Sequence, residues 1–382
     1  MKKLLLLLIL AALTLFSAGC SDIAAQLTAD TESEEEAGTE TAGEDAGEET
    51  DVPSAVSPLA LITGAAGVED DGYAAAAWAG LSKYAEESGL AAAFYPAEEE
   101  TLDSRLAAVA QAVENGAQFI ACAGAEYGDT VFEAQSIYPE IGFVLCDGEP
   151  HSLDFTEFAV GPNTYAVLYT APEAGFLAGY SLVAEGFTKV GFMGGMPLPA
   201  TVREGAGFIQ GVNQAAEDLQ KDVDLFYTYT GLLADDSSAQ NLAGSWYANG
   251  IEGIYVCGDF AASVCGAAEA ASAWVIACGC DRWQLSETVL TSTVKDIQGT
   301  VYQAASAWFG GGFWGGKQVT LGLSNAGVKL AMEHDRFSNF TTANLRMLLN
   351  RFDSGELSLT PVNTDKFDLT SLTGPRVTLT IE

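Results

Sequence analysis

Short apolar runs alternate with longer amphipathic segments through most of the chain, and this alternation restricts the fold more than any other feature of the sequence. The runs at 59–63, 119–123 and 142–146 are short enough for strands, while 73–88 and 102–115 have the apolar spacing of helices. Strands that are apolar throughout have both faces covered, and their alternation with long helices is typical of parallel sheets. The sequence therefore predicts an α/β fold with a doubly wound sheet.

The same pattern starts again after Gly161, which predicts a second Rossmann-like lobe and a central cleft between the two. A strand at 288–294 is expected to return toward the first lobe, where helix 297–309 packs, and the tail from Val319 is expected to cross again. The other predicted elements of this second run are helices 171–184, 203–218, 238–248 and 260–272, and strands 189–193, 223–229, 252–257 and 274–278.

A glycine turn lies inside the second run, between the apolar residues 190–193 and the amphipathic segment from 203. It contains Gly194 and Gly195 and continues into a proline-containing loop. In open α/β sheets, ligands bind at the carboxyl ends of strands, on turns of this kind. Taken alone, the stretch is equally compatible with a binding loop and with a purely structural turn.

The first twenty residues have the pattern of an export signal. Two lysines precede an apolar stretch, 4–16, that is short for a membrane span, and Ser-Ala-Gly-Cys follows at 17–20. Small residues before a cysteine resemble a bacterial lipobox, in which Cys20 would carry a lipid anchor on the extracytoplasmic face of the cell membrane. An ordinary signal peptide is the alternative, and both predict export.

Residues 21–57 form a predicted disordered linker. They hold about a dozen acidic residues, no Lys or Arg and no aromatic residue, so they cannot bury enough apolar surface to fold. We interpret this segment as a tether between the membrane and the folded part, which begins near Pro58. The formal net charge of the whole chain is −36, which argues against nucleic acid or an anionic lipid surface as a partner.

Several motifs together resemble the basic membrane protein (BMP) family, the substrate-binding lipoproteins of ABC transporters. The resemblance implies a type I periplasmic-binding-protein fold, with one lobe from 58–161 plus about 296–318 and the other from 162–295 plus about 319–382. It also implies capture of a nucleoside or related small molecule for an ABC permease, with no cofactor. The motifs are GFMGGMPLP and AGFIQGV within 191–212, GVEDDGYAAAAWAG at 67–80, YPEIGFVLCDG at 138–148 and LTSTVK at 290–295.

The resemblance also implies a set of ligand-binding residues. Tyr73 takes the place of an aromatic that stacks on a purine base, and Asp147 and Lys295 stand where the family contacts base and sugar. Taken singly, each residue has a structural alternative: Tyr73 as a packed loop aromatic, Asp147 as a helix or turn cap, and Lys295 as a solvent-facing side chain. The complete set of expected ligand-binding residues is Asp70, Tyr73, Asp147, Gly195, Leu233, Asp281 and Lys295.

Four positions depart from the family pattern. Ala74 replaces an Asn that hydrogen-bonds the base, Gly64 replaces an Asp, and Gly279 replaces the first acid of a D-x-D pattern. Leu233 stands where the family has a second aromatic platform. Because buried polar groups in a site select ligands that pair with them, these losses favour altered specificity over lost binding.

Enzymatic and metal-dependent functions have little support in the sequence. The two histidines are far apart, and neither a G-x-S-x-G nor a P-loop motif occurs. Apart from Cys20, six cysteines fall mostly at the ends of predicted strands, without a C-x-x-C pair, so no metal is expected. These cysteines are either buried thiols or disulfides. A surface sensor that uses the same cleft without a transporter is the alternative function, and a cleft hydrolase is a third.

Overall fold

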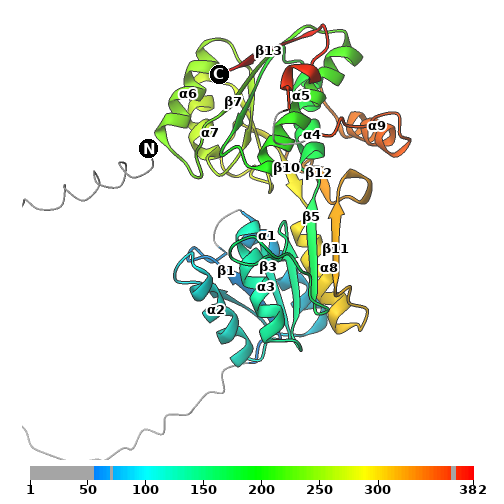
Figure 1. Ribbon diagram of the computed structural model, residues 1–382. Coiled ribbons are helices and arrows are strands. Elements are labelled where there is room, and N and C mark those ends of the chain that lie inside the picture. Colours follow the sequence, from blue (N-terminus) through cyan, green and yellow to red (C-terminus); the bar gives the residue numbers. More distant parts are fainter. Residues whose placement is uncertain (1–55, 69–71, 363–366) are drawn as a thin grey trace, which may run out of the picture. The chain divides into compact units, whose positions relative to one another are not determined.

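The computed structural model describes residues 56–68, 72–362 and 367–382, all of which belong to one compact unit. These residues form two β-sheets (Figure 1). Every neighbouring pair in the first sheet is parallel. In order across it, its strands are β11 (Lys317–Leu321), β5 (Thr164–Tyr169), β4 (Gly142–Cys146), β3 (Phe119–Ala123), β1 (Leu59–Thr63) and β2 (Ala92–Pro96).

The second sheet is also parallel, except that its edge strand β12 runs antiparallel to β10. This mixed edge is common in doubly wound folds. In order across the sheet, its strands are β12 (Val328–Leu330), β10 (Val289–Lys295), β9 (Trp274–Ala277), β8 (Gly253–Cys257), β6 (Lys189–Gly194), β7 (Val223–Tyr229) and β13 (Val377–Ile381).

Helices cover both faces of the first sheet, which explains why its inner strands are apolar throughout. On one face, Leu59, Leu61 and Phe119 pack with α1 (Tyr73–Ser88) and α8 (Ile297–Phe309). On the other, Ile62 and Phe143 pack with α2 (Leu102–Glu114) and α3 (Gly128–Ile137). Alternate residues of one strand therefore enter different cores, as the strand period of two requires.

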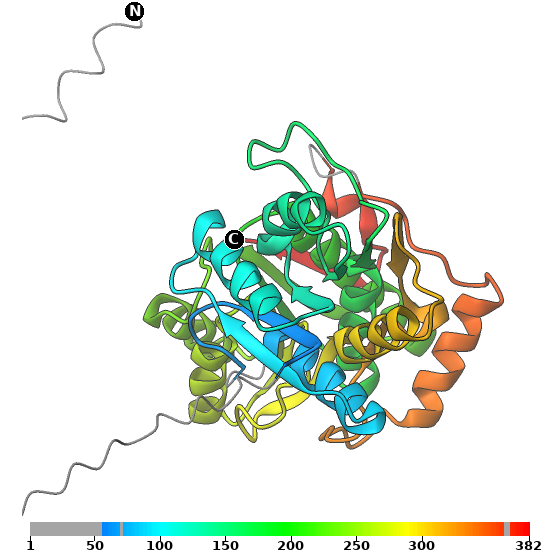
Figure 2. The same cartoon turned by 90° about the horizontal axis from the view of Figure 1, so that it is seen from below.

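The second sheet has the same three layers. One face packs with α4 (Ala171–Glu185) and α5 (Pro199–Leu219), and the other with α6 (Ser237–Ala248) and α7 (Ala261–Ala271). The helix α9 (Thr342–Asp353) lies at the outside of this lobe and packs against α4 (Figure 2).

Helices α4 and α5 approach each other closely enough to exclude side chains at their crossing. A Cβ atom added to Gly175 would lie 1.8 Å from the carbonyl oxygen of Glu204, and one added to Gly207 would lie 2.0 Å from that of Pro172. Both sites therefore require glycine.

The chain passes between the two sheets at three places: after β5, after β10 and after β11. This arrangement of two α/β lobes is the fold class expected from the sequence. The boundary expected after residue 161 lies one strand too early, because β5 pairs with β4 in the first sheet. Only Thr170 separates β5 from α4, so no turn signal marks the strand in the sequence. Strand β10 pairs with β9 in the second sheet, in agreement with the expected second-lobe segment 162–295, and the chain re-enters the first lobe at α8.

Three other details differ from the sequence-based expectations. Helix α3 is not predicted, α5 begins at Pro199 rather than 203, and β11 extends the first lobe to Leu321. Cys20 and most of the expected tether, 21–57, lie outside the described residues.

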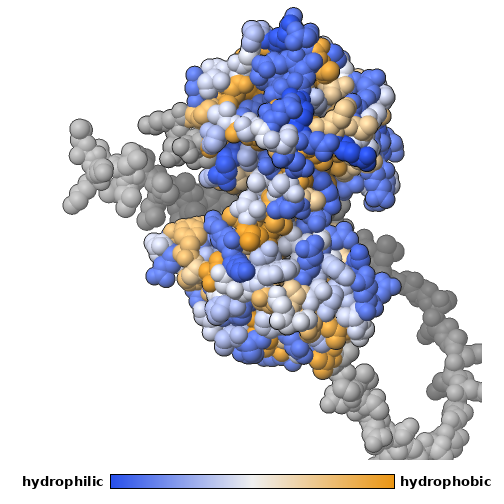
Figure 3. All heavy atoms as spheres, turned by 90° about the vertical axis from the view of Figure 1, so that its right-hand side faces the viewer, coloured by the Kyte–Doolittle hydropathy of each residue, from blue (hydrophilic) through white to orange (hydrophobic). Residues whose placement is uncertain are grey.

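Hydrophilic residues predominate on the face shown in Figure 3, with scattered apolar patches between them. Across the whole chain 52 acidic residues outnumber 16 basic ones. A strongly charged surface of one sign favours solubility over association. Among the described residues, no helix is both long and apolar enough to cross a lipid bilayer.

Candidate functional site

A cavity of about 510 Å³ lies between the carboxyl ends of the strands of the two sheets. Its first-lobe wall comes from the segments that follow β1, β2 and β3, and its second-lobe wall from those that follow β8 and β9 and from the start of α5. Small-molecule sites typically measure ~300–1,000 Å³ and occur at this edge of α/β sheets. The size and position both suit a small ligand that touches both lobes.

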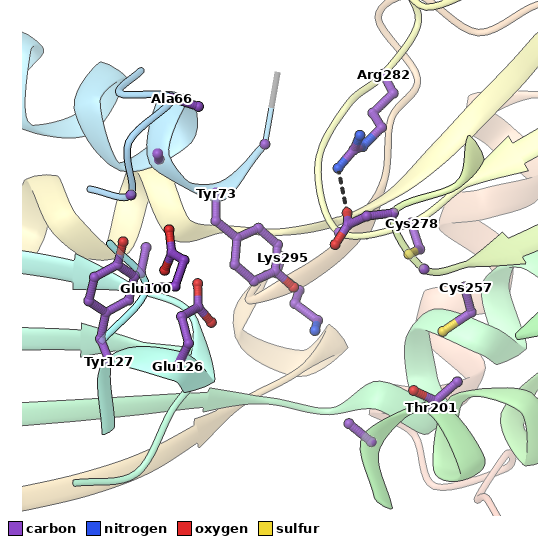
Figure 4. Close-up of a pocket in the computed structure, with 18 of the residues that line it drawn as sticks. Ala66, Tyr73, Glu100, Glu126, Tyr127, Thr201, Cys257, Cys278, Arg282 and Lys295 are labelled. Carbon is purple, nitrogen blue, oxygen red and sulfur yellow. Dashed lines mark hydrogen bonds and ion pairs between the residues drawn. The ribbon is translucent and has the colours of Figure 1, made fainter. Parts of the chain in front are cut away.

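Three predicted residues contact one another, and two of them line this cavity. Tyr73 is the first residue of α1, Asp147 directly follows β4, and Lys295 ends β10. The Tyr73 hydroxyl donates to Asp147 Oδ2 at 2.9 Å, and Lys295 Nζ lies 2.6 Å from the same oxygen and 5.5 Å from the centre of the Tyr73 ring. Tyr73 and Lys295 line the cavity (Figure 4), whereas Asp147 is outside its lining and contacts both of them. The network connects the two lobes.

The local backbone explains how Asp147 reaches this position. Its φ angle is 59°, in the left-handed region that Asp tolerates better than most residues. Its amide donates to the carbonyl oxygen of Val167 at 2.6 Å, which continues the pairing of β4 with β5 past the end of the strand. The side chain is then turned toward Lys295 rather than into the sheet.

The network has a defined protonation state. Burial opposes the charge on Lys295, but Tyr73, Asp147 and Glu204 outweigh it and raise the pKa of the ammonium well above its usual range. Burial raises the pKa of Tyr73, while Lys295 partly counteracts this shift. At neutral pH, Lys295 is therefore a cation and Tyr73 a neutral hydrogen-bond donor.

A set of carboxylates that the sequence reasoning missed lines the same cavity. Glu100, Glu126 and Asp259 are accessible from it, and Arg282 pairs with Asp259 at 3.1 Å (Figure 4). Carboxylates accept hydrogen bonds from hydroxyl, amino and ring N–H groups. The wall is therefore suited to a polar ligand with several donors.

A fourth carboxylate, Glu204, is only 4% exposed and lies in the second turn of α5. Burial raises its pKa, while Lys295 and the hydroxyl of Tyr255, which donates to Glu204 Oε1, lower it. Glu100, Glu126 and Asp259 share one signal, because each follows the end of a strand by a few residues, whereas Glu204 lies inside α5. With 52 acidic residues in the chain, that signal alone could not single them out.

The remaining predicted site residues lie elsewhere. Gly195 does not line the cavity; its amide donates to the carbonyl oxygen of Cys257 at 2.9 Å and holds the loop after β6 beside β8. Leu233 is 72% exposed and also outside the cavity lining. Asp281 lines a second cavity of about 570 Å³, where it lies 3.4 Å from His334. Asp70 is outside the described residues.

Three of the four positions that depart from the family pattern line the cavity. Gly64, Ala74 and Gly279 are part of its wall. A Cβ atom added to Gly279, whose φ is 85°, would lie 3.0 Å from the ring of Tyr73. The glycine therefore lets the second lobe approach the Tyr73 ring.

Comparison with known proteins decides the family. Residues 59–358 match the Bmp family, described as PnrA-like ABC transporter substrate-binding proteins. This chain belongs to that family. The assignment confirms the resemblance found in the sequence and makes the protein an extracytoplasmic substrate-binding protein of an ABC transporter, with a small-molecule ligand and a permease as partners. The Bmp family consists of solute-binding proteins rather than enzymes, and the assignment favours transport over the sensor alternative.

Individual relatives agree with this assignment. An ABC transporter nucleoside-binding protein BmpA from Lactococcus lactis is 25% identical over 297 residues, which cover 72% of this chain and 81% of that protein. An uncharacterized lipoprotein from Pyrococcus horikoshii is 26% identical over 212 residues, covering 51% and 49%. A solved solute-binding protein of an ABC transporter system from Conexibacter woesei has a TM-score of 0.65 at 21% identity and covers 79% of this chain and 98% of that one, which supports the same fold.

Proposed function

We propose that this Bmp-family protein captures a nucleoside, or a related compound with a flat polar ring, and is held at the membrane by a lipid on Cys20. The observation that carries the proposal is the position of Tyr73, whose ring lies in the cavity between the lobes with its hydroxyl fixed by Asp147. An aromatic ring offers a stacking surface to any base. The L. lactis relative is named a nucleoside-binding protein, which adds support.

The charges around the cavity fit a nucleoside better than a nucleotide. Glu100, Glu126 and Asp259 are placed to accept from ring N–H, amino and ribose hydroxyl groups, while a phosphate would meet their negative charges. Ala74 lacks the hydrogen-bonding side chain of the family's Asn, and at Gly64 the Glu100 carboxylate fills the space, with its Oε1 2.5 Å from where a Cβ atom would lie. The ligand can therefore differ from the family's purine nucleosides. The ligand bridges both walls and thereby favours a closed form that the permease binds.

The test is a titration of nucleosides and free sugars into the protein, followed by calorimetry and thermal unfolding. We expect at least one nucleoside to bind and to raise the unfolding midpoint, with ~2.7 kcal/mol of stabilisation at a ligand concentration of about 100 times Kd. Tyr73→Leu should weaken that binding by ~1–3 kcal/mol, roughly 5- to 150-fold.

A matched control exists on α8. The Tyr302 hydroxyl donates to Glu87 Oε2 at 2.6 Å, and Lys83 Nζ lies 5.1 Å from the centre of the Tyr302 ring, so its surroundings imitate those of Tyr73 outside the cavity. Tyr302→Leu should leave affinity unchanged. A nucleoside affinity that responds equally to both substitutions, or a protein that binds sugars but no nucleoside, would contradict the proposal.

Mass spectrometry of membrane-extracted protein tests the proposed lipid on Cys20. An unmodified Cys20 would contradict the lipid anchor.

A further inference from the structure

Two thiols lie side by side on the second-lobe wall of the cavity. Strands β8 and β9 are parallel neighbours, with Tyr255 opposite Ile276. Two residues further along, the same register places Cys257, the last residue of β8, opposite Cys278, the residue that follows β9. Both residues line the cavity, and Figure 4 shows their sulfur atoms on the side that faces it. The thiols are therefore neighbours with a common orientation.

A buried carboxylate completes this group. One oxygen of Glu204 and the two sulfur atoms all lie within 4.8 Å of one another. Glu204 reaches this point from α5, which packs over the same sheet. The hydroxyl of Tyr255 donates to Glu204 Oε1 and lies 2.9 Å from the hydroxyl of Thr293, so one side of the carboxylate is fixed by neutral hydroxyl groups. A second shell of this kind orients metal ligands.

The separations suit a tetrahedral soft cation. With Zn–S of about 2.3 Å and Zn–O of about 2.0–2.2 Å, ligand atoms in tetrahedral geometry lie ~3.6–3.8 Å apart. Small side-chain rotations bring three atoms that already lie within 4.8 Å to those distances. Thiolates select zinc-class and softer cations over magnesium and calcium, which prefer oxygen ligands alone.

We propose that Glu204, Cys257 and Cys278 bind one zinc-class divalent cation in the wall of the ligand cavity. On binding, the two thiols and the carboxyl group lose their protons to solvent, and the three anionic ligands leave a single net negative charge. Lys295 interacts electrostatically with both Glu204 and Cys257 and offsets this charge. The fourth coordination position faces the cavity, where water or a nitrogen or oxygen atom of the captured molecule occupies it.

This metal site goes beyond the proposed capture of a nucleoside and does not depend on it. Metal uptake is measured without any organic ligand, so the two proposals fail separately. The same thiols also have the spacing of a disulfide, because residues opposite each other on neighbouring strands are within the usual Cα separation of a disulfide. A disulfide between Cys257 and Cys278 does not involve Glu204, whereas the metal site does. Substitution of Glu204 therefore distinguishes a metal site from a disulfide.

The experiment uses reduced, chelator-treated full-length protein kept free of oxygen. Zn²⁺ is titrated by calorimetry, and Cd²⁺ by the sulfur-to-metal charge-transfer absorption in the ultraviolet. We expect one ion per chain and loss of most of the Cd²⁺ absorption in both Cys257→Ser and Cys278→Ser. Glu204→Gln should weaken binding by about tenfold or more but keep the absorption at saturating Cd²⁺.

Cys265→Ser is the matched control, because Cys265 is a buried cysteine of the same lobe, on α7 and outside the cluster. It should bind both ions as the unmodified protein does. Circular dichroism verifies that each variant is folded, and native mass spectrometry counts bound ions independently of absorption. The proposal is overturned if the reduced protein takes up no ion, if Cys257→Ser and Cys278→Ser bind normally, or if Glu204→Gln has no effect on affinity.

Discussion

Replacing Lys295 with Met should destabilise the protein far more than replacing an exposed lysine in a comparable ion pair. The substitution keeps most of the side-chain length but removes the ammonium group that lies 2.6 Å from Asp147 Oδ2. The side chains of Lys295 and Asp147 are only 12% and 19% exposed, so the remaining carboxylate is stranded with Tyr73 as its side-chain donor. The variant therefore tests how much the buried charge network contributes to the folded state.

The magnitude follows from burial. Removing one partner of a fully buried ion pair costs ~3–5 kcal/mol, and because some water reaches this pair, we expect ~2–3 kcal/mol. Lys329 and Asp296 form the comparison, since they are paired at 2.9 Å with 50% and 28% of their side chains exposed. Lys329→Met should cost ~0–1 kcal/mol.

Urea unfolding followed by tryptophan fluorescence and circular dichroism measures both costs, provided that the two signals give coincident transitions. Adding Asp147→Asn to Lys295→Met removes the stranded charge and should recover part of the loss, with a coupling of ~1–3 kcal/mol. The reasoning is wrong if Lys295→Met costs no more than Lys329→Met, or if the two substitutions at the network simply add.

Two further predictions concern the second lobe. Gly207→Ala should lower the free energy of unfolding by ~1–3 kcal/mol, because the added methyl group forces α4 and α5 apart. Gly244→Ala, in α6 with no atom within 4 Å of the added methyl group, should raise it by ~0.4–1 kcal/mol. Thermal unfolding distinguishes the two signs. Although burial raises the pKa of Asp218, hydrogen bonds led by that from Arg351 lower it overall, so its contribution to stability is present above about pH 4 and is lost as pH falls through the lowered pKa. The cost of Asp218→Asn, measured by urea unfolding, should therefore be greatest at pH 7 and should decrease as the pH falls below about 4; a cost independent of pH would contradict this assignment.

Much of the fold could be predicted because each sheet is covered on both faces. Runs such as 119–123 and 142–146 are apolar throughout, and the structure places strands at these same residues. Helix α3 was missed because GDTVFEAQSI begins with glycine and carries few apolar residues. Strand β5 was missed because it continues into α4 without a turn.

The candidate site could be predicted only in part. The family resemblance indicated Tyr73, Asp147 and Lys295, and their positions at the ends of predicted elements agreed with their meeting at one edge. Cys257 and Cys278 also end predicted strands, 252–257 and 274–278, but the sequence does not show that these two strands are neighbours. Twenty-odd residues separate the two thiols, and only the register of β8 with β9 brings them together. Sequence reasoning that searched for closely spaced cysteines therefore expected no metal.

The close crossing of α4 and α5 couples the positions of the two helices, because their backbones are in direct contact. The first turns of α5 hold Thr201 and Glu204 at the cavity, while α4 starts directly after Thr170, where the chain leaves the first sheet. With backbone against backbone at Gly175 and Gly207, no side chain lies between the helices there to absorb a displacement by changing its rotamer. A molecule that pulls on the start of α5 thus pulls directly on a segment joining the two halves of the protein.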